Sequence, residues 1–165
     1  MTKLLLSIHV LASILVVGPI AVAASMFPRY ARQTPGEDGH SAGATVLLHR
    51  ICSGYAIVGV AVPVFGIATG AQLGVLTDAW LLTSIVLTTI AAAILALAIL
   101  PGQESMIESA AAAAAAADGT GTGTGDGADT KRAAARLAGL TGVFNLLWAV
   151  VVVLMIVRPG STTGA

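Results

Sequence analysis

The sequence predicts an all-α fold, a bundle of four transmembrane helices, on two observations. The first is composition: of 165 residues, 56% are hydrophobic and only 10% are charged, whereas about a quarter of the residues of an average soluble domain are charged. The second is length, because about 20 apolar residues in a helix cross a bilayer core. Four runs of that length occur, at residues 4–25, 46–69, 79–100 and 134–157. Backbone groups in lipid must be bonded within their own segment, so each run is predicted to be a helix.

The first run also resembles a cleavable signal peptide. Lys3 precedes an apolar stretch that ends in small residues at positions 21–23, as in a secretory leader. However, the stretch is longer than a typical leader core and contains His9. Cleavage would also leave the arginines that follow it outside the cell, against the positive-inside rule. We therefore expect this run to be retained as the first helix.

The distribution of basic residues predicts the orientation of the helices. Lys3 and Arg158 lie on one side, and the connections on the other side carry Arg29, Arg32, Arg50, Lys131, Arg132 and Arg136. This excess predicts that those two connections are cytoplasmic and that both termini are extracytoplasmic. Trp80, at the start of the third run, is typical of the aromatic belt at the outer surface.

The long connection at residues 101–133 reads as two different segments. Residues 103–117 are rich in alanine, which has the highest helix propensity, so they are predicted to prolong the third helix beyond the membrane. Residues 119–127 alternate glycine with threonine and are predicted to form a flexible cytoplasmic linker.

Small and polar residues in the second and fourth runs predict how the helices pack. Gly59, Pro63, Gly66 and Gly70 recur at spacings of three and four, which is typical of a close helix contact in membranes. The main interpretation is a packing face inside the bundle, and a homo-oligomer is the alternative. Pro19 in the first run and Pro63 in the second lack an N–H group, so kinks are expected at both. Asn145, near the middle of the fourth run, is expected to face the interior.

His9 is the one ionisable residue placed well inside a run, and such residues are functional candidates in membranes. Ser13 lies one turn further along the same face. One interpretation is a neutral histidine bonded to Ser13 or to another helix. The other is a ligand for haem or copper, or a proton-handling group. A transmembrane haem would need a second ligand at this depth, for which Met155 and Ser84 are the candidates.

Basic residues near the cytoplasmic ends of the first two runs predict contact with lipid headgroups. Arg29, Arg32, His49 and Arg50 form a patch suited to anionic lipids. The chain has eight lysines and arginines and eight aspartates and glutamates. This balance gives no support for nucleic-acid binding, which needs a clustered basic face. The single cysteine, Cys52, is interpreted as a packing residue.

Several segments resemble the DUF2269 family of small predicted bacterial integral membrane proteins. They are residues 3–12, 18–19, 26–30, 48–50, 62–66 and 74–80, so the resemblance covers most of the chain except the Ala-rich and Gly-Thr-rich insert. It implies four helices in the bacterial plasma membrane, without a biochemical role. The first helix is also similar to that of copper-resistance D proteins and of the J-type protoporphyrinogen oxidase, in which a histidine is linked with copper or haem. Of that motif, His9 is the matching residue.

The sequence shows no intramembrane acidic pair and no cluster with metal-ligand spacing. The leading hypothesis is therefore a non-enzymatic membrane protein with a structural, partner-binding or transport-accessory role, and no cofactor is predicted for it. One alternative is a haem- or copper-binding redox protein that uses His9. Another is a small transporter or channel, which would require oligomers to enclose a pathway.

Overall fold

A computed structural model describes residues 2–33, 40–118 and 127–160. Within these ranges the chain forms helices and a single π-helical turn, and no strand occurs. The elements are α1 (Thr2–Tyr30), α2 (His40–Gly59), α3 (Ala61–Leu73), α4 (Ala79–Ile94), the π-helical turn η1 (Leu95–Ile99), α5 (Leu100–Asp118) and α6 (Gly127–Val157). The predicted all-α fold is confirmed.

The elements form four long rods, each apolar enough to cross a membrane. The rods are α1, α2 with α3, α4 with η1 and α5, and α6. The last rod has 31 residues, or about 46 Å at 1.5 Å per residue, against a bilayer core of about 30 Å. The helices therefore extend beyond a bilayer. α5 covers the alanine-rich segment, α6 begins ahead of the predicted fourth span, and residues 119–126 of the predicted linker lie outside the described residues.

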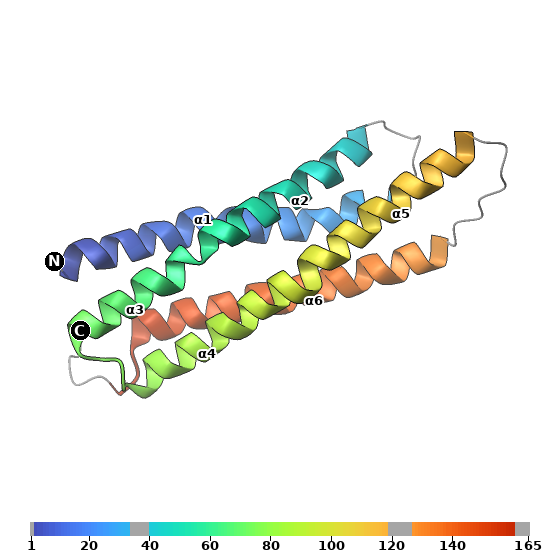
Figure 1. Cartoon of the computed structure of the whole chain (residues 1–165). Coiled ribbons are helices and arrows are strands. Elements are labelled where there is room, and N and C mark those ends of the chain that lie inside the picture. Colours follow the sequence, from blue (N-terminus) through green and yellow to red (C-terminus); the bar gives the residue numbers. More distant parts are fainter. Residues whose placement is uncertain (1, 34–39, 119–126, 161–165) are drawn as a thin grey trace.

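The rods run antiparallel to their neighbours in sequence (Figure 1). One end of the bundle holds the start of α1, the turn between α3 and α4 and the end of α6; we call it the termini end. The opposite end, toward which α1, α2, α5 and α6 all extend, is the two-loop end. α1 packs against α2, α3 and α6, α4 packs mainly against α6, and α5 contacts α2 and α6.

The second rod is broken at Val60, between α2 and α3. The amide of Val60 donates to the carbonyl of Ile57 at 3.3 Å, and the amide of Val64 donates to the carbonyl of Val60 at 3.4 Å. Pro63 has no N–H to give to the carbonyl of Gly59, one turn earlier. The rod changes direction at this point (Figure 1). α1, in contrast, continues without interruption through its two internal prolines, Pro19 and Pro28.

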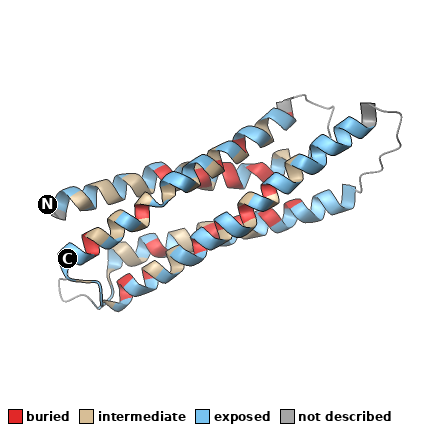
Figure 2. Ribbon diagram, viewed as in Figure 1, coloured by how far each residue is buried: buried red, intermediate tan, exposed pale blue. Residues whose placement is uncertain are grey.

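A central core of buried side chains holds the rods together in the middle of the bundle (Figure 2). Phe27, Cys52, Ile99 and Phe144 are almost completely buried there, and so is Gln103. We use the name central core for these residues and the other members of the same cluster, which are Val16, Ile20, Ala23, Ala24, Leu48, Val62, Ala91, Leu95 and Leu137.

The π-helical turn η1 keeps one face of the third rod directed into this core. Buried residues recur at every fourth position, at Ala91, Leu95, Ile99 and Gln103. A regular α-helix has 3.6 residues per turn, so a spacing of four would drift around its axis. The i→i+5 bonds of a π turn accommodate an extra residue and compensate for that drift. Gln103 therefore reaches the interior, although its sequence neighbours are polar.

Candidate functional site

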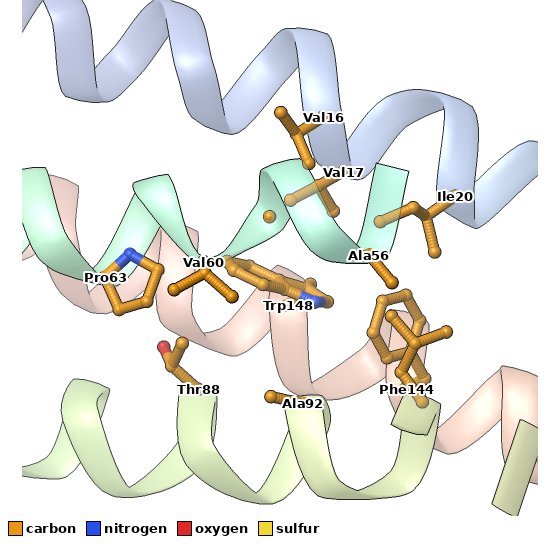
Figure 3. A pocket seen from close by; sticks show the side chains of 12 residues that line it. Val16, Val17, Ile20, Ala56, Val60, Pro63, Thr88, Ala92, Phe144 and Trp148 are labelled. Carbon is orange, nitrogen blue, oxygen red and sulfur yellow. The ribbon is translucent and has the colours of Figure 1, made fainter. Parts of the chain in front are cut away.

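A cavity of about 130 Å³ lies beside the break in the second rod, and all four rods contribute to its wall. Val60 and Pro63 face Thr88 and Ala92 across it, and Trp148 stands on the α6 side (Figure 3). The remaining lining residues are Val16, Val17, Ile20, Ala56, Gly59, Leu95 and Phe144. We call this space the α3–α4 cleft, because α3 and α4 pack mainly against other helices and leave it between them. None of the residues that line it is ionisable.

One residue that lines the α3–α4 cleft, Trp148, carries a polar group that lacks a partner. The indole Nε1 of Trp148 is buried and donates to no acceptor among the described residues. Two further groups on α6, Oγ1 of Thr141 and Oδ1 of Asn145, are also buried and unpartnered. Leaving a buried donor or acceptor unsatisfied costs about 1–3 kcal/mol. Such groups in a native fold call for an explanation, and a ligand that pairs with them is one.

His9 is held by a backbone carbonyl of the second rod. Its Nδ1 lies 3.0 Å from the carbonyl oxygen of Val62, and because a carbonyl only accepts, Nδ1 must carry the proton. In the neutral ring, Nε2 then carries a lone pair. Ser13 donates to the backbone carbonyl of His9 at 2.7 Å, so of the two bonds considered for a neutral His9, the structure has the one to another helix.

His49 takes part in a buried network that sequence reasoning did not identify. Its Nδ1 lies 3.2 Å from Oε1 of Gln103, whose Nε2 donates to Sγ of Cys52 at 3.7 Å. Gln103 is completely buried, although its neighbours Glu104 and Ser105 are exposed. The sequence does carry a signal, which is the four-residue spacing of the positions along the third rod that end at Gln103. This spacing indicates one buried face only if a π turn interrupts the α-helix.

The predicted lipid-headgroup patch divides between the surface and the interior. Arg29, Arg32 and Arg50 are exposed, whereas His49 is half-buried and turned toward Gln103. The structure therefore places three of the four residues at the surface and the fourth against Gln103.

The predicted packing residues of the second and fourth rods approach more than one neighbouring rod. A Cβ added at Gly59 would lie 3.5 Å from Val16, and one added at Gly66 would lie 2.9 Å from the ring of His9. At Gly70 it would lie 2.8 Å from Leu81 of α4. Pro63 lines the α3–α4 cleft. On the fourth rod, Asn145 is half-buried and donates from Nδ2 to Oγ of Ser25 on α1 at 3.1 Å.

The sequence predicts that Trp80 lies in the aromatic belt at the membrane surface. In the structure only 6% of its surface is exposed. Its Nε1 donates to Oδ2 of Asp78 at 3.0 Å. The guanidinium carbon of Arg158 lies 5.6 Å from the centre of a Trp80 ring, within range of a cation–π interaction. This aromatic side chain thus joins the end of α6 to the start of α4 rather than facing lipid.

Fold and composition together define this chain as a four-span integral membrane protein. Comparison with protein families agrees, since the model for a predicted integral membrane protein family, DUF2269, matches residues 3–159. The chain belongs to the DUF2269 family. No curated protein and no solved structure matches it significantly.

Proposed function

We propose that this protein binds a lipophilic molecule, which enters the α3–α4 cleft from the bilayer. The observation that carries the proposal is the buried, unpartnered Nε1 of Trp148 in the wall of an otherwise apolar cavity. Apolar cavities of about 150 Å³ bind ligands of benzene size, and this one measures about 130 Å³. An occupant with a carbonyl or ether oxygen would accept from the indole and remove the cost of an unpaired donor.

The lining residues support binding rather than chemistry. They offer no nucleophile paired with a base and no acidic group, which general acid–base or covalent catalysis requires. The helix break lies at the same level, and the carbonyl of Gly59 lacks an amide donor there because Pro63 has no N–H. The proposed role is therefore partner-binding or transport-accessory, and the cleft holds a membrane-soluble ligand.

Tryptophan fluorescence tests whether lipid chains enter the cleft. The chain has two tryptophans, so Trp80→Phe leaves Trp148 as the only emitter and Trp148→Phe leaves Trp80. In vesicles of phospholipids brominated at mid-chain, we expect strong quenching of Trp148 and weak quenching of the buried Trp80. Thr88→Leu should reduce the quenching of Trp148 by filling the cleft, whereas Thr89→Leu, on the exposed side of α4, should not. Equal quenching in these two leucine variants would overturn the proposal.

For the orientation, we propose that the two-loop end is cytoplasmic and that both termini are extracytoplasmic, in a bacterial plasma membrane. The basic residues that decide the positive-inside comparison lie toward the two-loop end and are exposed. Their exposure also supports contact with anionic headgroups there. A reporter fused after Ala165 that is active only outside the cytoplasm would agree, and cytoplasmic activity would refute the orientation.

A second candidate function is haem binding through His9, which its hydrogen bond favours. Histidines that bind metals usually donate their other ring N–H to a carbonyl or carboxylate, as Nδ1 does to Val62. Among the described residues no group of three or more His, Cys, Asp and Glu side chains could hold a metal ion. The residues thus fit one nitrogen ligand from His9 to a haem iron better than a copper centre. When bound, haem would supply redox chemistry.

The absorption spectrum of protein purified from haem-replete cells tests this candidate. A Soret band that disappears in His9→Ala but persists in His49→Ala would support it, and its absence from the unaltered protein would refute it. A homo-oligomer, or another membrane protein as partner, remains a prediction. The size of the protein particle in detergent would test for an oligomer, which the transporter or channel alternative also requires.

A further inference from the structure

Arg50 is a positive charge in the middle of a helix surface that is otherwise apolar. On the same side of α2, Leu47 is 58% exposed, Tyr55 39% and Val58 55%. Arg50 itself is exposed. The one ion pair among the described residues joins Arg132 to Asp129, so no described carboxylate neutralises Arg50. An arginine among lipid-facing residues is costly unless an anion or water reaches it.

A surface groove of about 280 Å³ begins at this arginine. Arg50, Ile51, Gly54, Tyr55 and Val58 line it. Its depth comes from Gly54, where an added Cβ would meet no atom within 4 Å. Residues 50, 54 and 58 follow each other at intervals of one turn, so the missing side chain leaves a notch along the helix axis.

The two polar side chains of the groove project the same way. Helical side chains lean toward the N-terminus of their helix, which for α2 is the two-loop end. Arg50 and Tyr55, five residues and so about 140° apart around the helix, therefore flank the notch from its two sides and both lean toward the two-loop end. Both are hydrogen-bond donors, and guanidinium matches phosphate oxygens in charge and geometry.

From this arrangement we infer that the groove on α2 is a binding site for one anionic phospholipid. Its phosphate contacts Arg50, and one acyl chain lies over Gly54 between Tyr55 and Val58. This site is separate from the α3–α4 cleft, whose lining residues are different. It rests on the proposal that the two-loop end meets the headgroups of a leaflet, and it names the particular arginine that binds.

Competition between spin-labelled phosphatidylglycerol and phosphatidylcholine in vesicles containing the full chain tests the inference. We expect the unaltered protein to prefer phosphatidylglycerol. A basic residue near an anionic surface contributes about 1 kcal/mol, so Arg50→Gln should lower the preference about fivefold. Gly54→Leu should lower it similarly by filling the notch while keeping the charge. Arg32→Gln, which removes an exposed arginine outside the groove, should change it less than twofold.

Each other outcome has a defined meaning. Equal losses in Arg32→Gln and Arg50→Gln would overturn the groove and leave a diffuse basic patch. No effect of Gly54→Leu would show that the acyl chain does not use the notch, which also overturns the site. No preference in the unaltered protein would overturn both the site and the headgroup proposal. The thermal unfolding of each variant in detergent identifies any that has lost its fold, and Gly54→Ala then replaces Gly54→Leu.

Discussion

The central core and the α3–α4 cleft are built from the same four apolar rods, yet one is filled and the other is open. In the core, α2 packs on α1 and contacts α5, and the π turn directs Ile99 and Gln103 inward. Beyond Val60, the second rod changes direction and leaves the cleft between α3 and α4. Apolar surface alone does not drive helices together in lipid. The difference shows that local backbone features decide where the rods meet.

One polar group in each region follows the same division, although Oγ1 of Thr141 and Oδ1 of Asn145 are unpartnered outside the lining of the cleft. In the core, the buried amide of Gln103 lies at hydrogen-bond distance from both His49 and Cys52. At the cleft, the indole N–H of Trp148 is buried without an acceptor among the described residues. A satisfied network rigidifies a fold, whereas an unsatisfied group is a reason to expect a ligand. Structural stability therefore belongs to the first region, and binding is proposed for the second.

The largest expected difference concerns two leucines that are equally buried. Leu137, at the core, and Leu81, between α4 and α3, are both 3% exposed. Leu→Ala substitutions cost about 2.7–5.0 kcal/mol, depending on how far the site relaxes. We expect Leu137→Ala to fall near the top of that range and Leu81→Ala near the bottom, because α3 and α4 pack mainly against other helices and can relax toward each other. Unfolding in a mixed-micelle denaturant titration measures both. Equal losses would show that the two regions are packed equally well.

The next largest effect concerns the close contact between the first two rods at Gly66. A Cβ there would lie 2.9 Å from Cε1 of His9, so Gly66→Ala must displace the ring and its bond to Val62. Overpacking of this kind costs about 1–3 kcal/mol. Gly142→Ala is the matched control, because nothing lies within 4 Å of its added Cβ, and helix propensity should stabilise it slightly. If both variants keep the original stability, the contact at His9 is looser than described.

The contacts of Gly66 and Gly70 illustrate how much of the fold the sequence could predict. Length and hydropathy were enough for four membrane-spanning helices, because the bilayer sets the length of a span. The glycine spacing indicated close packing but not the partner: Gly66 meets His9, while Gly70 meets Leu81. Gln103 and Trp148 were missed because burial in a bundle depends on the mutual rotation of the rods. That rotation depends in turn on the π turn and on the break at Val60, which apolar patterns do not encode.

A smaller effect is expected from breaking the hydrogen-bond network around Gln103 in the core. Gln103→Leu keeps a side chain of similar size but leaves Nδ1 of His49 without its acceptor, which should cost about 1–2 kcal/mol. Replacing both partners, with His49→Leu and Gln103→Leu together, should cost less than the sum of the two single changes. The free energy of unfolding of all four proteins completes the cycle. Strict additivity would mean that the two side chains do not interact.

The smallest effect is expected at the termini end, where Arg158 covers Trp80. Arg158→Gln removes the cation but keeps a polar side chain of comparable length, so it should lower the free energy of unfolding by about 0.5–1 kcal/mol, as for an exposed cation–π pair. Lys3→Gln removes an exposed charge from the same end and should have little effect. The emission of Trp80 in a Trp148→Phe background should change in Arg158→Gln alone. A loss of stability equal to that of Leu81→Ala would make this contact a main support of the termini end, and the contrast with the central core would have to be redrawn.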